Sequence, residues 1–190
     1  MRTWLFAAMT VLAASGATPV EGNAKSPVRV IAYESMQCSD CTVYRRMMDE
    51  QLLPKYGDRV AFEHRDFPLE KHKWARAAAI AARHFDTIRL GAEFRRWALN
   101  NIKSITPETF EAQLTDWAKK NAADPAKVLA ALKDETLARQ VEEDYQDGIA
   151  RGVARTPTVF VNGEPFIETF TVEEISKSID AALAATKTNK

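Results

Sequence analysis

The chain has 190 residues, a length that suits one domain with an insertion, and its 46% hydrophobic content is enough to fill a sizeable core. Lysine and arginine total 26, the same as aspartate and glutamate, so the overall charge argues against nucleic acid or an anionic membrane as the partner. Composition alone leaves enzymes and protein-binding modules open.

The first seventeen residues have the pattern of a secretory signal peptide. Met1 and Arg2 give a short positive start, residues 3–14 are mostly apolar, and Ser15-Gly16-Ala17 offers the small residues of a cleavage site. This apolar run is shorter than the roughly 20 residues needed to span a bilayer, although an uncleaved membrane anchor is the alternative. We therefore expect a mature chain that begins near Thr18 in the periplasm or another extracytoplasmic compartment.

The next segment, YESMQCSDC, contains the only two cysteines, Cys38 and Cys41. A structural disulfide between them would stabilise the fold little, because the stabilisation grows with the length of the closed loop. A metal site would need two more ligands, and the three histidines at positions 64, 72 and 84 lack a zinc-binding spacing. The sequence thus favours a redox-active pair of cysteines over a metal site. The oxidising compartment of an exported protein permits such a pair to form a disulfide.

The residues around the cysteines predict a strand followed by a helix. VRVIAY at 28–33 is a β-branched and aromatic run, and apolar residues then recur at helical spacing until Pro54 and Gly57. Cys38 should lie at the helix N-terminus, where free N–H groups and the positive end of the helix dipole favour a thiolate. Cys41, one turn later, should be more buried and suited to resolving a mixed disulfide.

A second strand is predicted at 59–69, so that strand, helix and strand form a unit of the kind that favours a parallel pair. Residues 70–152 then read almost wholly as helix, with helix starts at Thr106-Pro107 and Asp124-Pro125 and a stop near Gly148 and Gly152. The large aromatic residues of this block are expected to form its core: Trp74, Trp97, Phe110 and Trp117.

A further pattern typical of β-strands follows at residues 155–168, RTPTVFVNGEPFIE. Two short strands flank Asn162-Gly163, a strong signal for a hairpin because both residues tolerate positive φ. Pro165 restricts the second strand to a position such as an edge, where a missing N–H is harmless. A final helix is predicted at 172–184.

This order of elements resembles the DsbA-type thioredoxin-fold oxidoreductases, including their Gram-positive relatives. YESMQCSDC, RDFPL and RTPTVFVNG carry the resemblance, which extends from about residue 28 to residue 184. It implies an α/β thioredoxin fold with a helical insertion between the second strand and the cis-proline strand. The thioredoxin-fold domain would comprise 27–69 and 153–186, and the insertion 70–152.

The resemblance also implies roles for site residues. Cys38 would be the nucleophile and Cys41 the resolving cysteine. A cis peptide bond is implied before Pro157, with Thr156 packed against the cysteine pair.

Three histidines fit no acid–base spacing and are interpreted as surface groups, although His64 deserves notice because its strand should lie beside the first.

Two departures from the family pattern concern redox tuning. The family commonly has an acidic residue six positions before the first cysteine, where it handles the proton of the buried thiol, but that position is Ala32 here. Glu34, four positions before Cys38, need not replace that function. The dipeptide between the cysteines is Ser39-Asp40, where strongly oxidising members often have proline and histidine. The Asp40 carboxylate opposes a thiolate, or else it caps the helix and favours its dipole. We expect a milder oxidant than the strongest members of the family.

The expected function is an exported thiol-disulfide oxidoreductase that exchanges its Cys38–Cys41 disulfide with cysteines of secreted proteins. It would need no dissociable cofactor, and a membrane quinone-linked thiol oxidase or a thiol reductant would recycle it. The alternatives are a reductase or reducing relay, a non-catalytic thioredoxin-fold module that binds client proteins, and a structural role with inert cysteines. A monomer is expected, and no nucleic-acid partner.

Overall fold

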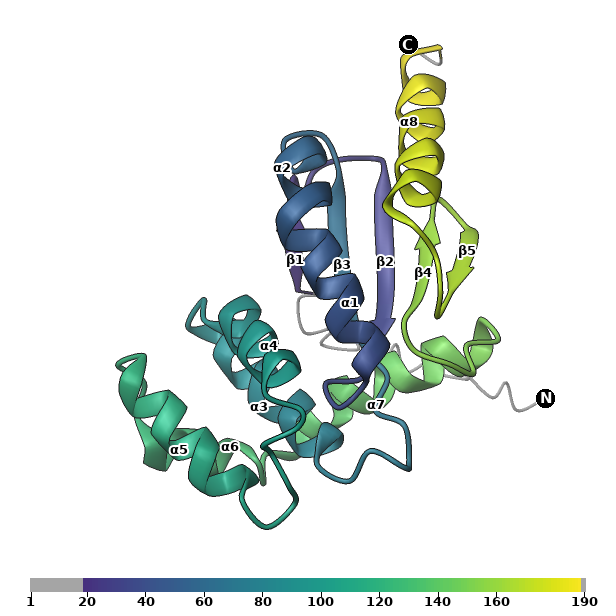
Figure 1. The fold of residues 1–190 in the computed structure, drawn as a ribbon. Helices are drawn as coiled ribbons and strands as arrows, with labels where there is room; N and C mark the ends of the chain where they lie inside the picture. Colours follow the sequence, from purple (N-terminus) through teal and green to yellow (C-terminus); the bar gives the residue numbers. More distant parts are fainter. Residues whose placement is uncertain (1–18, 189–190) are drawn as a thin grey trace, which may run out of the picture.

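The computed structural model describes residues 19–188, and the predicted signal peptide at 1–17 lies outside them. Five strands form one sheet in the order β1-β3-β2-β4-β5 (Figure 1). Only β2 and β3 are parallel, and the other neighbours are antiparallel. The strands are β1 Val20–Gly22, β2 Arg29–Glu34, β3 Ala61–Asp66, β4 Thr158–Val161 and β5 Glu164–Ile167.

The predicted parallel pair is confirmed, since β2 and β3 run side by side with Ala32 opposite His64 and Glu34 opposite Asp66. The edge strand β1 was not predicted. It has only three residues and pairs antiparallel with β3, so it is too short to give a periodic signal in the sequence. It places Glu21 opposite Phe62 of β3.

The helix that follows β2 continues through Pro54. Helix α1 (Ser39–Met47) leads into a π-helical segment, η1 (Met48–Leu52), and then into α2 (Leu53–Tyr56). The predicted break at Pro54 is wrong, because this proline lies in the first turn of α2, where a missing N–H is tolerated. The helix ends before Gly57, as predicted.

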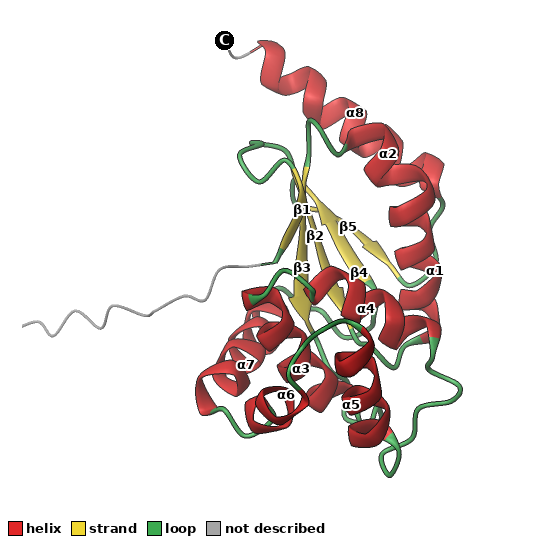
Figure 2. Cartoon of the chain, turned by 90° about the vertical axis from the view of Figure 1, so that its left-hand side faces the viewer, coloured by secondary structure: helices red, strands yellow, loops and turns green. Residues whose placement is uncertain are grey.

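Helices cover both faces of the sheet. Figure 2 shows α1, α2 and α8 (Val172–Thr188) on one face. Their apolar side chains, including Tyr44, Leu52 and Ile179, pack with Val30 of β2. On the other face lies α7 (Glu135–Ala150), whose Gly148 approaches so closely that a Cβ there would meet the Phe67 ring at 2.6 Å.

Five helices lie between β3 and β4, at the end of the sheet where β2 finishes (Figure 1). They are α3 Ala75–Thr87, α4 Gly91–Asn100, α5 Phe110–Lys120, α6 Pro125–Ala131 and α7. The prediction that aromatic residues form their core is confirmed, since Trp74, Phe110 and Trp117 are buried and Trp97 packs against them. The limits of the insertion at residues 70 and 152 stay a prediction.

The ends of these helices agree in part with the sequence signals. Asp124 caps α6 and accepts a hydrogen bond from the Ala126 N–H at 2.9 Å, as predicted. Helix α5 begins later than Thr106-Pro107, because the Thr106 and Thr109 hydroxyls accept hydrogen bonds from each other's backbone N–H and hold a turn. Helix α7 ends at Ala150, between Gly148 and Gly152, so the predicted stop near these two glycines is confirmed.

The predicted hairpin joins β4 and β5, with φ of 45° at Asn162 and 96° at Gly163. Pro165 lies on the edge strand β5, as expected. Within residues 19–188, no helix is long and apolar enough to cross a membrane.

Candidate active site

The two cysteines lie at the N-terminus of α1, just after the loop that connects β2 to this helix. Cys38 is the N-cap residue, with extended backbone dihedrals, and Cys41 falls in the first turn. Both are free thiols, and Cys38 is 7% exposed whereas Cys41 is fully buried. The predicted placement of the pair is confirmed.

Hydrogen bonds around Cys38 favour its ionised form. They lower the pKa of Cys38 to about 6. The largest contribution is the hydrogen bond with the Cys41 side chain, and burial opposes it. The Thr156 side chain and the backbone N–H groups of Cys41 and Asp40 contribute further. Cys38 therefore has the environment of a reactive cysteine at neutral pH.

The loop before β4 completes this environment. The Thr156–Pro157 peptide bond is cis, as the resemblance implies. The Cys38 thiol donates to the Thr156 carbonyl oxygen at 3.1 Å. The Thr156 hydroxyl is buried, and in the described part of the chain it has no hydrogen-bond partner while Cys38 is a thiol. It is thus free to donate to the sulfur once Cys38 ionises.

The two residues between the cysteines are exposed. Asp40 lies in the first turn of α1, where a negative charge favours the helix dipole. Its interpretation as the helix cap is wrong, because Cys38 occupies that position and no side chain caps the helix. The pKa of Cys38 is lowered with the Asp40 carboxylate in place, and the main effect that opposes this lowering is burial of the sulfur.

An open pocket of about 620 Å³ adjoins Cys38. It contains side chains that the sequence analysis did not connect with the site, because they come from separate loops at the start of, within and after the helical insertion. His72 is one of them; its Nδ1 lies 2.7 Å from the Ser35 hydroxyl, so it belongs to the site rather than to a remote surface. The charged residues lining this pocket are Asp40, Lys71, Lys103, Arg155 and Glu168.

Cys41 lies in a different environment. Burial, the hydrogen bond with Cys38 and the charge of Glu34 together raise the pKa of Cys41 well above its ordinary value. Glu34 is the last residue of β2 and is buried. The structure therefore brings an acidic residue within electrostatic reach of the buried cysteine from position 34, whereas Ala32 offers none.

His64 lies beside Glu34 with only 13% of its side chain exposed, so its interpretation as a surface group is wrong. Its Nδ1 lies 2.8 Å from Glu34 Oε2 and its Nε2 lies 3.1 Å from Asp66 Oδ1. Burial and the charge of Arg95 lower the pKa of His64, but the hydrogen bonds to Asp66 and Glu34 outweigh them and raise it. The sequence analysis singled out His64 because its strand was expected beside the first, but it did not predict the cluster, whose parts come from two strands.

Asp66 is held in its ionised form by a second set of contacts. Arg83 Nε donates to Asp66 Oδ2 at 2.6 Å, and Arg83 also pairs with Asp144 of α7. Burial raises the pKa of Asp66, but the charge of Arg83 and the hydrogen bond from His64 bring it below its ordinary value. With an ionised carboxylate at Nε2, His64 is stabilised as the imidazolium.

Metal-binding clusters are not evident at the site: between residues 19 and 188, no group of three or more histidine, cysteine, aspartate or glutamate side chains is suited to hold a metal ion.

Comparison with known proteins agrees with this geometry. Residues 14–181 match the profile of the family described as thioredoxin. A putative protein-disulfide oxidoreductase of Rickettsia prowazekii is 29% identical over 175 residues, which cover 86% of this chain and 61% of that protein. A Na⁺/H⁺ antiporter of Salinispora arenicola is 26% identical over 170 residues, 88% of this chain but 25% of the antiporter. The chain thus spans about a quarter to three fifths of these relatives.

Solved structures show the same fold. The crystal structure of α-DsbA1 from Wolbachia pipientis has a TM-score of 0.79 at 18% identity and covers 90% of this chain and 92% of its own. BdbD from Bacillus subtilis, in its oxidised form, has a TM-score of 0.71 at 24% identity, with 88% and 93% covered. The chain belongs to the thioredoxin family and has the DsbA-type form of its fold, with the helical insertion between β3 and β4.

Proposed function

We propose that the protein is an exported thiol-disulfide oxidoreductase that exchanges a Cys38–Cys41 disulfide with cysteines of other exported proteins. The observation that carries the proposal is the contrast within one helical turn. Cys38 has a pKa lowered to about 6, whereas Cys41 is fully buried with a raised pKa. The Cys38 sulfur can attack or leave as a thiolate, whereas the Cys41 sulfur is shielded from other molecules by burial.

In the oxidising direction, a client thiolate attacks Cys38 Sγ of the disulfide form. The Cys38–Cys41 bond breaks, and Cys41 leaves with the electron pair and takes up a proton. A second client thiolate then attacks the client sulfur of the mixed disulfide and releases Cys38 as a thiolate, which hydrogen bonds from the Cys41 side chain, the Thr156 side chain and the backbone N–H groups at the helix start stabilise. The client dithiol is oxidised to a disulfide, the enzyme disulfide is reduced to a dithiol, and no dissociable cofactor takes part.

The lowered pKa of Cys38 supports the oxidising direction. It stabilises the reduced enzyme at neutral pH, and a stabilised reduced form makes the disulfide a stronger oxidant. A thiol oxidase of the membrane, linked to quinone, would then regenerate the disulfide. The exported location rests on the signal-peptide pattern of residues 1–17.

Refolding of a reduced, disulfide-containing protein tests the activity. The oxidised enzyme should accelerate the formation of native disulfides, and Cys38→Ser should not. A reductase or reducing relay would instead show a potential near that of thioredoxin, about −270 mV, in equilibrium with glutathione. We expect a potential between about −120 and −180 mV, the range of known oxidases and isomerases.

A client-binding module is the second candidate, and the open pocket beside Cys38 is the observation that favours it. Such a module would protect the client from aggregation without accelerating disulfide formation. The same refolding assay, followed by both light scattering and recovered client activity, separates the two functions.

A further inference from the structure

The pocket beside Cys38 is the part of the surface that a client must enter in order to reach the sulfur. Its volume is about 620 Å³. The lining comes from the start of α1 and from the loops after β3, after α4, before β4 and after β5. Because Cys38 belongs to this lining, the charges of the pocket act on the client residues that flank the reacting cysteine.

Two lysines in the lining have no anionic partner. Lys71 lies in the loop after β3 and Lys103 in the loop after α4, and both residues are exposed. Among residues 19–188, the only lysine that forms an ion pair is Lys55, with Asp180. The positive charges of Lys71 and Lys103 are therefore available to a bound client.

The other charged side chains of the pocket do not cancel this excess of positive charge. Arg155 Nη1 donates to Glu168 Oε2 at 2.6 Å, so these two charges offset each other. His72 is neutral at pH 7, because burial and the charge of Lys71 lower its pKa. Asp40 is the remaining anion, and it lies in the first turn of α1, where its charge favours the helix dipole.

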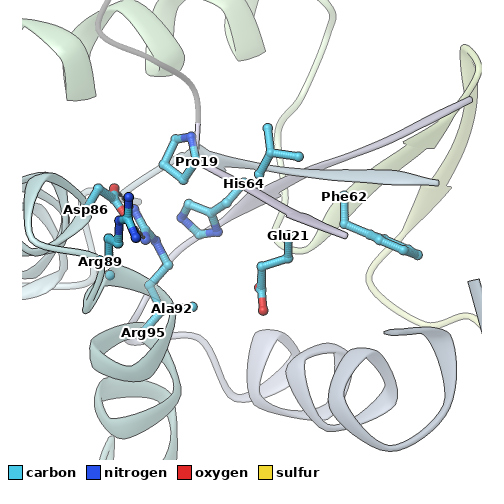
Figure 3. A pocket seen from close by; sticks show the side chains of 10 residues that line it. Pro19, Glu21, Phe62, His64, Asp86, Arg89, Ala92 and Arg95 are labelled. Carbon is cyan, nitrogen blue, oxygen red and sulfur yellow. Dashed lines mark hydrogen bonds and ion pairs between the residues drawn. The ribbon is translucent and has the colours of Figure 1, made fainter. Parts of the chain in front are cut away.

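A second pocket, of about 350 Å³, shares no lining residue with the first and has a different balance of charge. Figure 3 shows Asp86, Arg89 and Arg95 together on one side of it. Arg95 donates two hydrogen bonds to Asp86, each at 2.7 Å, and Glu21 pairs with two arginines from outside the lining. Most charges of that pocket are offset within the protein, whereas the two lysines beside Cys38 are not.

We propose that Lys71 and Lys103 select clients that have an acidic residue next to the cysteine that reacts with Cys38. This inference rests on the proposed function and gives it a substrate class. An extended chain advances about 3.3–3.6 Å per residue, so residues one or two positions from the client cysteine lie within about 7 Å of it. A glutamate or aspartate there pairs with the lysines of the pocket, whereas a lysine there is repelled.

The selection acts through exposed charges, which sets its size and its dependence on salt. Water screens each pair between a pocket lysine and a client carboxylate, so the effect of one pair on the rate is modest. Charges at the rim of an interface act mainly on the rate of association, and this action weakens as the ionic strength rises. A preference for acidic clients should therefore be measurable at low salt and should fade at high salt.

Oxidation of three dithiol peptides by the disulfide form of the protein tests the proposal. The peptides share one sequence and differ only in the residues on both sides of the first cysteine, which are glutamate, glutamine or lysine. The rate constant is measured for the wild type and for Lys71→Glu/Lys103→Glu at low ionic strength. The preference is the rate constant of the glutamate peptide divided by that of the lysine peptide. Comparing the preferences of two proteins cancels the effect of the flanking charges on the peptide's own thiol.

The preference should fall about tenfold from the wild type to Lys71→Glu/Lys103→Glu, and Lys71→Gln/Lys103→Gln should give an intermediate value. In about 1 M salt, where the Debye length is about 3 Å, the proteins should agree to within about twofold. The matched control is Lys119→Glu/Lys120→Glu, which reverses two exposed charges at the end of α5, outside both pockets. It should keep the wild-type preference.

A fall in the preference of less than about twofold at low salt would overturn the proposal. So would an equal fall in the control, or a fall that high salt does not reduce. The glutamine peptide reports the proposed function itself. If the wild type does not oxidise that peptide, the exchange reaction fails, whereas an unchanged preference with normal oxidation of the glutamine peptide contradicts the selection of acidic clients alone.

Discussion

The two ends of the cysteine motif differ more than their three-residue separation suggests. The outer site, comprising Cys38, Ser39, Asp40 and Thr156, borders an open pocket and depends on hydrogen bonds that stabilise a thiolate. The inner site, comprising Cys41, Glu34, His64 and Asp66, is buried and depends on paired charges between strands. The fold thus separates the sulfur that borders the open pocket from the paired charges of the interior.

The largest expected effect divides the two cysteines. Cys38→Ser should abolish thiol-disulfide turnover, because no other accessible thiol exists in the chain. Cys41→Ser should still react once with a client but should remain trapped as a mixed disulfide, since no resolving sulfur is left. Non-reducing gels after mixing with a client distinguish the outcomes. Equal trapping by both variants would contradict the assigned roles.

A substitution that removes a buried charge next to the inner site should lower the free energy of unfolding and leave the reactivity of Cys38 unchanged. Arg83→Met leaves the buried Asp66 and Asp144 carboxylates without their shared cation, which should lower the free energy of unfolding by about 3–5 kcal/mol. Burial raises the pKa of Asp66, but the charge of Arg83 lowers it by more, so the net pKa lies below its ordinary value. The stability that the Arg83–Asp66 pair contributes is therefore complete above about pH 4, the ordinary pKa of aspartate, and is lost as the pH falls below it.

Urea unfolding at neutral pH measures this difference. The control is Arg76→Met, which breaks an exposed pair with Glu142 and should cost about 0.5 kcal/mol or less. Equal losses in the two variants would show that the buried charges do not stabilise the interior in the way described.

A smaller effect is expected from the outer site when its cysteine is kept. Thr156→Val removes the hydroxyl that helps to lower the pKa of Cys38, so that pKa should rise and the reduction potential should become more reducing. Ultraviolet absorbance of the thiolate against pH measures the first change, and glutathione equilibrium the second. Thr169→Val, on an exposed loop, should leave both at wild-type values.

The smallest effect should come from Asp40→Ala. Because the Asp40 side chain is exposed, water screens its charge, and Coulomb's law at about 6 Å gives roughly 0.7 kcal/mol, or roughly 15 mV towards the oxidising end. Asp58→Ala, also exposed, serves as the control. A shift as large as that of Thr156→Val would mean that the carboxylate acts directly on the sulfur.

Local signals in the sequence predicted the outer site well. A cysteine pair between a strand and an amphipathic helix fixes the position of Cys38 by short-range rules alone. The Asn162-Gly163 turn likewise predicts its hairpin, and the family resemblance supplies the cis bond before Pro157. These features depend on residues that are neighbours in the chain.

The inner site was predicted poorly because it depends on register between strands. Glu34 and Asp66 are opposite each other, and His64 reaches both, only once β2 and β3 pair in one register. A shift of one residue would turn these side chains to the other face. The pocket beside Cys38 was missed for a similar reason, since Lys71, His72 and Lys103 are brought together by the packing of the insertion.

The most direct test of the account is the rate at which iodoacetamide alkylates the reduced protein, measured against pH with the modified residue identified by mass spectrometry. Since only the thiolate reacts, the account predicts modification of Cys38 alone, with a rate that rises with pH, has its midpoint at about 6 and then levels off. A midpoint near 8.5, roughly that of an unperturbed cysteine, or equal modification of Cys41, would contradict it.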